Sequence, residues 1–545
     1  MSDFPWLTVL VLVPLVGSVA VALLPLPAAQ AKQAGLAVSV VTLALAAAVA
    51  AQFDVDGGMQ LTETHDWISA FGVHYALGVD GLGLLLILLT AVLVPLVLLA
   101  AWSDTDQPLG PDGEDETTRQ GSGRAFVAWT LALEALSLAV FAATDVFLFY
   151  VVFEATLIPA YFLVGGFGRE GRSAAALKFL MFQLAGGLVL LASVIGLYVV
   201  SAQQGSPSYL LSDLEQLDIG TEAGRWLFLG FFIAFAVKAP LFPVHTWLAD
   251  TTERATPATS VLLVCVLDKI GTFGMLRFCL GLFPEASQWA TPVVVALALV
   301  SIVYGALIAI GQDDILRLIG LTSLSHFGFI TLGIFVLNTQ GGSGAVLYMV
   351  NHGLGTAALF LAAGFVIRRR GTTLISQMGG VEKVTPVLAG LFLVAGLATL
   401  GLPGLSTFVS EFLVIIAAFQ YQWWVGAIAV TGIVLAAIYV LWMYQRTMTG
   451  PTVPALTGAE DPGAGSDGTG SDGAGSTRTD LTVREGVVLV PLVVGLVLFG
   501  FYPGPLLEAS NPYVGTLLER VGVTDDAPTV TSPESETPAS AEEGS

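Results

Sequence analysis

Apolar stretches long enough to cross a lipid bilayer recur along this 545-residue chain, and they restrict its fold more than any other feature. A transmembrane helix needs about 20 largely apolar residues, and the runs 293–310, 388–402 and 487–501 are free of charged residues. Only 11% of the residues are charged, against roughly 25% in soluble domains, which is too few to cover a soluble surface. The first run, Leu7–Leu26, follows no basic segment, so it predicts a spanning helix and not a cleaved signal peptide.

Counting the apolar runs between polar loops predicts an all-α polytopic membrane protein with about 14 transmembrane helices. The expected spans are 5–26, 34–52, 80–102, 124–143, 146–166, 174–202, 224–245, 256–281, 290–311, 315–338, 342–368, 386–417, 423–447 and 483–503. The expected domains are three N-terminal helices in 1–123, a first inverted five-helix repeat in 124–281, a second in 290–450, a flexible cytoplasmic linker in 451–482, a last transmembrane helix in 483–503 and an acidic, disordered tail in 504–545.

Lysine and arginine are divided unequally between the two sets of loops, and this division predicts the orientation. If the N-terminus lies outside, fifteen of the twenty basic residues fall in cytoplasmic loops or at the helix ends beside them. Only Arg225, Arg277 and Arg520 lie on the opposite side, and Lys238 and Lys269 remain for the interior. We therefore expect a multi-pass protein in the plasma membrane of a prokaryote, with both termini outside. The acidic loops and tail carry most of the net charge of −22, and no basic patch predicts nucleic-acid binding.

Ionisable side chains lie inside the apolar runs, where a charge costs about 2.5–3.5 kcal/mol or more. Such residues need a partner, water or a function. They belong to at least five different predicted helices and include all three types of group that can exchange protons near neutral pH. They are Glu154, Lys238, Lys269, His352 and Glu411, with His326 as a sixth candidate.

Purely structural explanations exist for several of these side chains. Glu154 and Lys238 could form a static ion pair that fixes helix packing. Asp268 could only neutralise Lys269, and His326 could simply donate to a carbonyl. One pair would be enough for packing, however, whereas a series of Glu, Lys and His groups suits a proton relay. Each group in such a series can take up or release a proton when its neighbour's charge changes.

Proline and glycine interrupt two of the helices that carry these residues. Pro240 and Pro243 follow Lys238, and the sequence GLPG at 401–404 precedes Glu411. Proline removes a backbone donor, and broken backbone at membrane depth is tolerated where it is buried in protein or lines a hydrated cavity. Interrupted helices in both halves of a chain are typical of inverted-repeat transporters.

Motifs that would bind a nucleotide or a metal are missing from the sequence. The glycines at 78–83 open a spanning helix and do not follow a strand, so they do not predict a nucleotide loop. Cys265 and Cys279 are too few for a disulfide framework, a zinc site or an iron–sulfur cluster. We expect no cofactor and no metal in this chain, whose energy must then come from an ion gradient or a partner protein.

Five segments resemble the antiporter-like membrane subunits of the proton-pumping NADH-quinone oxidoreductase (respiratory complex I), a family that includes the Mrp-type sodium/proton antiporters. They read FEATLIPAYFLVG, FAVKAPLFPVHTWLAD, DDILRLIGLTSLSHFGFI, NHGLGTAALF and LPGLSTFVSEF, and the likeness covers about residues 70–450. The glutamate at 411 favours the subunit M type over the L type. The lack of a long C-terminal amphipathic helix with a further anchor favours it too.

The resemblance implies a role for each of the six candidates. Glu154 and Lys238 match the Glu–Lys pair of the family, Lys269 the lysine that links two half-channels, His326 and His352 two further histidines, and Glu411 the acid near the outward route.

Two positions after the seventh helix depart from the family pattern, which commonly reads HxWLPxAH. Ala249 replaces the proline and Thr252 the second histidine, so uptake from the cytoplasm would depend on Thr252 and water. Asp268 also stands where many relatives have an apolar residue, and it could lower the cost of a charged Lys269.

The leading hypothesis is a proton-translocating subunit of NADH-quinone oxidoreductase. Quinone reduction would occur in partner subunits, which would hold NADH, FMN, iron–sulfur clusters and quinone, with L-type and N-type antiporter-like subunits as neighbours. Weakening the Glu154–Lys238 pair would push a proton toward Lys269. The proton would continue through water, His326 and His352 to Glu411.

Three alternatives remain at this stage: an Mrp-type sodium/proton antiporter subunit, the membrane subunit of an energy-converting hydrogenase-like complex, and a purely structural membrane anchor.

Overall fold

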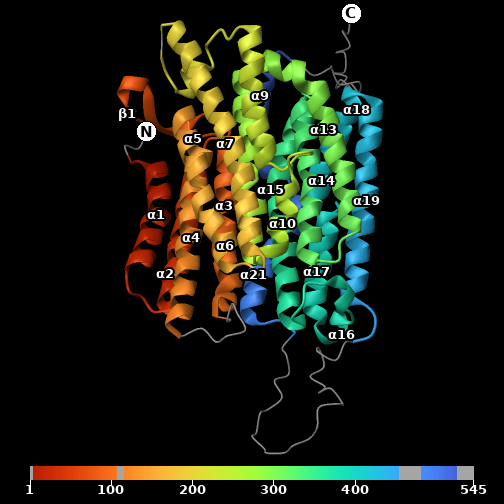
Figure 1. Cartoon of the computed structure of the whole chain (residues 1–545). Coiled ribbons are helices and arrows are strands. Elements are labelled where there is room, and N and C mark those ends of the chain that lie inside the picture. The colour runs from red at the N-terminus through yellow and green to blue at the C-terminus, as the bar shows by residue number, and fades with distance from the viewer. Residues whose placement is uncertain (1–3, 107–115, 206, 453–479, 524–545) are drawn as a thin grey trace, which may run out of the picture.

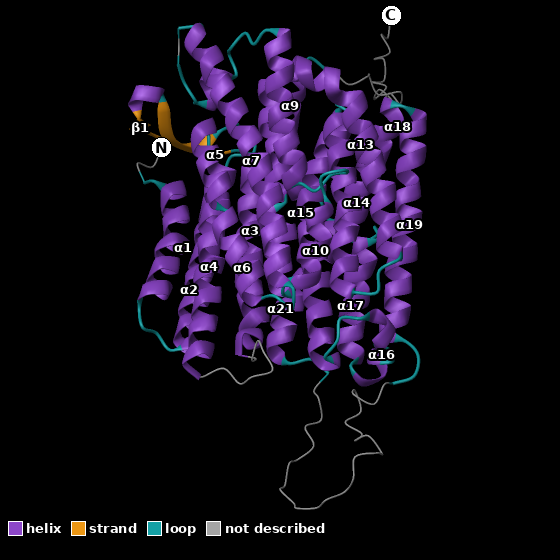
Figure 2. Cartoon of the chain, in the orientation of Figure 1, coloured by secondary structure: helices purple, strands orange, loops and turns teal. Residues whose placement is uncertain are grey.

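The computed structural model describes residues 4–106, 116–205, 207–452 and 480–523, which form one bundle of upright helices (Figure 1). Twelve helices in these ranges are long and apolar enough to cross a membrane. The described chain is therefore an all-α polytopic membrane protein, with one short strand pair at one end (Figure 2). Two further predicted spans are not among these twelve: 386–417 is divided into two shorter helices, and 224–245 contains one helix, which ends at Lys238, so the count of 14 spans stays a prediction.

The elements have the following bounds in chain order: α1 Trp6–Leu23, α2 Ala28–Gln52, β1 Gln60–Ile68, η1 Ser69–Phe71, β2 Val73–Val79, α3 Gly81–Ala100, η2 Ala101–Asp106, α4 Glu116–Ala142, α5 Val146–Ala155, α6 Leu157–Phe167, α7 Arg172–Gln203, α8 Leu211–Leu214, α9 Thr221–Lys238, α10 Thr246–Arg254, α11 Pro257–Val261, η3 Leu262–Leu267, α12 Lys269–Gly274, η4 Met275–Leu280, α13 Pro284–Ile310, α14 Ile315–Phe335, α15 Thr339–Arg370, η5 Ile375–Gln377, α16 Val381–Val384, α17 Pro386–Thr399, α18 Ser406–Tyr421, α19 Trp423–Met448, α21 Val483–Phe501 and α22 Gly504–Val521.

Several long helices begin at a side chain that accepts from their first free amide groups. Asp80, Asp145, Asp314 and Asn338 cap α3, α5, α14 and α15 in this way. An apolar run follows the three aspartate caps at once or within a turn, and cap and run together fix where these helices start. The cap of α5 thereby determines how deep in the bundle Glu154 lies.

The two interruptions predicted from proline and glycine are present. Pro240 and Pro243 lie between α9 and α10. Gly401 and Gly404 lie between α17 and α18, with φ angles of +77° and +91° that glycine adopts far more readily than other residues. In each predicted five-helix repeat the interrupted helix is the fourth, but the repeat boundaries themselves stay a prediction.

Irregular turns in two other helices were not expected from the sequence. The helix that carries Lys269 has π-helical turns on both sides of α12, in η3 and η4. A second irregularity separates α5 from α6 at Thr156, two residues after Glu154. Such π turns often occur at functional sites, and here they flank predicted site residues.

The strand pair and α22 lie at the same end of the bundle, which we call the hairpin end. β1 and β2 pair antiparallel, and Glu63 of β1 accepts from the Leu7 amide at the start of α1 (2.8 Å). Residues 504–521 form α22, which packs on α3 and α15. The expectation of a disordered tail from residue 504 is therefore wrong for these residues, because their apolar side chains recur at helical spacing among the charges. The rest of that tail from 524, and residues 453–479 of the linker, lie outside the described residues.

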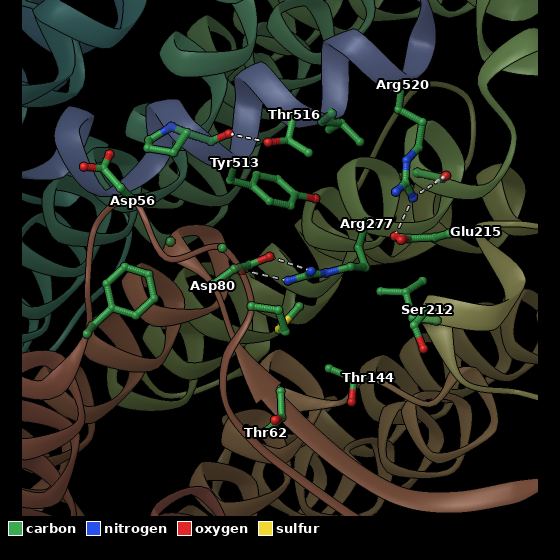
Figure 3. Close-up of a pocket in the computed structure, with 18 of the residues that line it drawn as sticks. Asp56, Thr62, Asp80, Thr144, Ser212, Glu215, Arg277, Tyr513, Thr516 and Arg520 are labelled. Carbon is green, nitrogen blue, oxygen red and sulfur yellow. Dashed lines mark hydrogen bonds and ion pairs between the residues drawn. The ribbon is translucent and has the colours of Figure 1, made fainter. Parts of the chain in front are cut away.

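A cavity of about 370 Å³ opens at the hairpin end, between the hairpin, α22 and the loop before α9 (Figure 3). Two ion pairs line it. Arg277 donates to both carboxylate oxygens of Asp80 (2.6 and 2.8 Å), and each side chain is only 6% exposed. Arg520 pairs with Glu215 (2.7 Å) and is more exposed, at 33% and 25%.

Phenylalanine rings separate this cavity from the centre of the bundle. The Arg277 guanidinium lies 5.1 Å from the ring centre of Phe273, and Phe273 packs against Phe141 and Phe149. Phe273 is one helical turn from Lys269, so an apolar layer lies between that lysine and the cavity.

Replacing Asp80 with Asn should lower the stability of the chain by about 3–5 kcal/mol, because it leaves the buried Arg277 charge unpaired. Glu215→Gln is the matched control, since it breaks the more exposed pair in the same cavity and should cost about 1 kcal/mol or less. Thermal unfolding of the purified variants measures both effects. Equal midpoints for the two variants would contradict this assignment.

Candidate functional site

Glu154 is positioned by a glycine on the neighbouring helix. A Cβ added at Gly187 of α7 would overlap the Glu154 carboxyl group, so only glycine leaves room for it. The side chain is partly buried, and its Oε1 has no hydrogen-bond partner among the described residues. Packing against Gly187 therefore holds the Glu154 carboxyl group, and its Oε1 makes no hydrogen bond to another described residue.

Lys238 is 1% exposed at the last residue of α9. Its Nζ donates to the Thr156 hydroxyl (3.3 Å) and lies 4.7 Å from the ring centre of Phe153. The ion pairs of the described residues do not include a direct contact with Glu154, although the two charges interact through space. The static ion pair considered from the sequence is therefore not formed in this structure.

Lys269 is fully buried in α12 at the centre of the bundle. Its Nζ lies 2.6 Å from Nδ1 of His352 and 3.3 Å from the carbonyl oxygen of Val264. It also lies 4.4 Å from the ring centre of Phe327, which gives a cation–π contact. Asp268 is next to it in the chain and is 1% exposed, so a second buried charge is available nearby.

His326 and Glu411 are joined by a tyrosine that sequence reasoning missed. The Tyr348 hydroxyl lies 2.7 Å from Nδ1 of His326 and donates to Glu411 Oε1 (2.5 Å). All three side chains are buried. Tyr348 lies one turn before His352 on α15, and this i, i+4 spacing is the signal that could have identified it.

Glu411 is also positioned by a glycine, as Glu154 is. A Cβ added at Gly401, in the break between α17 and α18, would overlap its Oε2. Neither that oxygen nor the hydroxyl of nearby Tyr439 has a hydrogen-bond partner in the described part of the chain. The break in the helix thus makes the space in which this carboxyl group lies.

The structure brings four of the six predicted residues into one line but reverses the expected order of the histidines. His352 contacts Lys269, and His326 contacts the tyrosine that binds Glu411. The two imidazole rings are 5.2 Å apart, centre to centre. The predicted order places His326 next to Lys269, but the imidazole that contacts Lys269 is that of His352 on α15, and sequence position alone could not indicate this. Glu154 and Lys238 lie apart from this line, on the first-repeat side.

The predicted uptake position is closed by packing. Thr252 is fully buried, and its hydroxyl donates to the carbonyl groups of Leu248 and Ala249 within α10. Its side chain also packs against Gly320, where a Cβ would overlap it. Thr252 therefore offers no unpaired group to a proton, and the expectation that it replaces the missing histidine is not supported by this geometry.

Charged residues surround a cleft of about 610 Å³ at the end of the bundle opposite the hairpin, beside α10. Lys178 and Arg317 both bind Asp250, at 2.5 and 2.7 Å. Near it, Asp313 in the loop after α13 accepts from Ser376 and Arg446, and these contacts hold the pKa of its carboxyl group below the usual value. These pairs tie the helix ends together around the cleft.

Groups that exchange protons make up the whole central line, which we call the polar axis: Lys269, His352, His326, Tyr348 and Glu411. A tyrosine hydroxyl between an imidazole and a carboxyl group can pass a proton by donating to one while accepting from the other. One water is enough to join the two imidazoles, whose Nε2 atoms have no partner among the described residues. The geometry can therefore move a proton sideways through the bundle.

Comparison with known proteins shows relatives that match most of the chain. The family model described as NADH:quinone oxidoreductase/Mrp antiporter, TM matches residues 143–436, which contain all six candidates. Subunit M of NADH-quinone oxidoreductase from Mycobacterium tuberculosis is 49% identical over 98% of this chain and 97% of its own. The same subunit from Rhodobacter capsulatus is 36% identical over 90% and 91%.

Solved structures share the fold. A chain of respiratory complex I from Thermus thermophilus with bound NADH matches with a TM-score of 0.81 and 32% identity, covering 95% of this chain and 100% of that chain. A chain of the Mrp complex from Dietzia sp. DQ12-45-1b has the same TM-score of 0.81 at 22% identity, covering 96% and 100%. A match at 22% identity shows the shared fold alone.

The fold and its buried ionisable groups define an antiporter-like membrane protein, and the chain belongs to the NADH:quinone oxidoreductase/Mrp antiporter family. Within this family, the relatives at 49% and 36% identity are both subunit M of NADH-quinone oxidoreductase. The resemblance predicted from the five sequence segments is confirmed.

Replacing Gly187 with Ala should displace the Glu154 carboxyl group, because the added methyl group takes its place. We expect a loss of about 1–3 kcal/mol in stability, as for other overpacked cores. Gly166→Ala on α6 is the matched control, since a Cβ there meets nothing within 4 Å. A structure of the variant with Glu154 unmoved, and unfolding equal to that of the control, would show that the glycine does not position it.

Proposed function

We infer that this chain is a proton-translocating membrane subunit of NADH-quinone oxidoreductase, of the subunit M type. One observation carries the proposal: buried proton-exchanging groups run from Lys269 to Glu411 with hydrogen-bond contacts at both ends of the line. A structural anchor needs no such series, because each buried polar group costs free energy unless it is paired.

The proposed path crosses from the first repeat to the second. Lys238 holds a proton while the negative charge of Glu154 is near, and weakening that interaction drives the proton toward Lys269. From Lys269 it passes to His352, then through one bridging water to His326. Tyr348 transfers it to Glu411, to which its hydroxyl donates. Moving one charge against 100 mV costs about 2.3 kcal/mol.

Release is proposed to occur from Glu411 and not through the cavity at the hairpin end. The phenylalanine layer around Phe273 and the Arg277–Asp80 ion pair lie between Lys269 and that cavity. A fixed guanidinium also repels a proton. On the other side, Lys269 Nζ has a proton-exchanging neighbour, His352 Nδ1, at 2.6 Å.

Membrane orientation follows from the basic residues. Arg277 and Arg520 line the hairpin-end cavity (Figure 3), whereas Lys178, Arg317 and Arg446 lie at the opposite end. By the positive-inside rule we place the hairpin end, and with it both termini, outside the plasma membrane of a prokaryote. Release of protons from Glu411 would then be outward.

The driving reaction is proposed to lie in other subunits. NADH, FMN, iron–sulfur clusters and quinone would be bound by partners, and L-type and N-type antiporter-like subunits would be the neighbours in the membrane. The relatives named subunit M belong to an enzyme of this kind. An Mrp-type antiporter subunit is less well supported, because the Mrp chain shares only the fold at 22% identity.

Tyr348→Phe in the assembled complex tests this proposal. Removing the hydroxyl breaks the link between His326 and Glu411 but keeps the ring packing, so proton transfer through this chain should slow by about a hundredfold. The measurement is the number of protons pumped per NADH oxidised by the complex in sealed vesicles, and it should fall.

Tyr161→Phe is the matched control, because that tyrosine lies on α6 away from the polar axis and should leave pumping unchanged. If Tyr348→Phe pumps as many protons per NADH as the unaltered complex, the path through the tyrosine is wrong.

A further inference from the structure

Helix α4 carries a buried polar face that the proposed path does not use. Thr130, Glu134 and Ser137 are each 0% exposed. Their spacing of four and three residues places them on one side of the helix, over about 10 Å of its length. A polar face of this kind is unusual in a helix with this many apolar residues.

None of the side-chain oxygens on this face has a hydrogen-bond partner among the described residues. Hydroxyl groups in membrane helices normally donate to a carbonyl one turn back, as Thr90, Thr272 and Thr291 do here. Thr130 and Ser137 do not. Buried polar groups are almost always satisfied by protein or by water, so four oxygens on one face indicate a site that binds water.

Glu134 adds a buried ionisable group to this polar face. Both of its carboxyl oxygens are buried without a partner, and the ion pairs of the described chain do not include it. An isolated ionised carboxyl group is very costly away from water. Ionisable residues inside membrane helices are functional candidates by default.

One end of the face meets a small cavity at the end of the bundle opposite the hairpin. This cavity, of about 10 Å³, is close to the space that one water needs. Val127 and Gly123 of α4 line it, and they lie one and two turns before Thr130 on the same side of the helix. Lys32 also lines it and donates to the Trp102 carbonyl group (2.6 Å).

The other end of the face reaches the level of Glu154. Phe126 packs on Phe167 and Trp129 on Phe162, which fixes the antiparallel register of α4 on α6. Ser137 lies eight residues after Trp129 on α4, and Glu154 lies eight residues before Phe162 on the antiparallel segment. This register brings Ser137 and Glu154 to the same level. Ser137 is also three turns from Phe126, so it lies on the side of α4 that packs on α6.

We propose that the face formed by Thr130, Glu134 and Ser137 binds a file of water molecules and conducts protons from the cytoplasmic side to the Glu154–Lys238 pair. This inference rests on the proposed function and supplies the uptake route that Thr252 does not. The face does not continue to the hairpin end, because Phe141, one turn beyond Ser137, packs on Phe273.

The proton transfer balances at each step. A protonated Glu134 releases its proton through water beside Ser137 to the carboxylate of Glu154 or the neutral amine of Lys238. The Glu134 carboxylate that remains then takes up a proton from the water beside Thr130. Thr42 of α2 lies at about the same level as Glu134, since Gly35 approaches Val127 two turns earlier on both helices.

Glu134→Gln in the assembled complex is the test, because it keeps the shape of the side chain and removes its exchangeable proton. We expect proton pumping coupled to NADH oxidation in sealed vesicles to slow about tenfold or more, and Glu134→Asp to restore most of it. Redox-induced infrared difference spectra of the unaltered complex should contain a carboxyl band that Glu134→Gln removes.

Two parallel variants separate the possible failures. Glu222→Gln, an exposed acid in the first turn of α9, should have no effect. Lys238→Ala should abolish pumping through this chain. If Lys238→Ala does so while Glu134→Gln pumps normally and keeps the infrared band, the uptake face is refuted and the proposed function stands. If Lys238→Ala also pumps normally, the proposed function itself fails.

Discussion

The buried charge of Lys269 is the constraint on which the rest of the structure depends. A cation without a partner in this interior would cost several kcal/mol. In this fold His352 at 2.6 Å and the Phe327 ring at 4.4 Å stabilise it. Both contacts require α14 and α15 to pass close beside α12. Because α15 is continuous through the bundle, the same helix face then carries Tyr348 one turn away, and the Tyr348 hydroxyl donates to Glu411 of α18.

The polar axis runs toward the second predicted repeat because packing closes the hairpin side of Lys269. The phenylalanine layer around Phe273 and the Arg277–Asp80 pair lie above Lys269, so its polar neighbours lie sideways, toward the second predicted repeat. At the opposite end, charged pairs tie helix ends around a cleft, while Thr252 is closed by packing. The two halves of the chain thus have different tasks under the proposed function: one takes up protons and the other releases them.

Sequence reasoning predicted the fold class and the two interrupted helices, and it selected six candidate residues whose roles stay a prediction, because charges and prolines in apolar runs are visible without a structure. It missed Tyr348 and Glu134. A tyrosine is ordinary in a membrane helix, and Glu134 lies near the middle of a run that otherwise counts as apolar. The order of the histidines could not be predicted, since it depends on which helices touch. The predicted tail includes residues 504–521 because this segment is much less apolar than the spanning runs, although its apolar side chains recur at helical spacing.

The central claim is that Lys269 connects the two halves of one proton path. Lys269→Met keeps the length of the side chain and removes its charge and its exchangeable protons. The most direct measurement is the ratio of protons pumped to electrons transferred by the assembled complex carrying this variant in sealed vesicles, compared with Lys178→Met at the rim of the cleft beside α10. We predict that the ratio falls for Lys269→Met and is kept for Lys178→Met. An unchanged ratio for Lys269→Met, in a complex that still assembles and oxidises NADH, would contradict the claim.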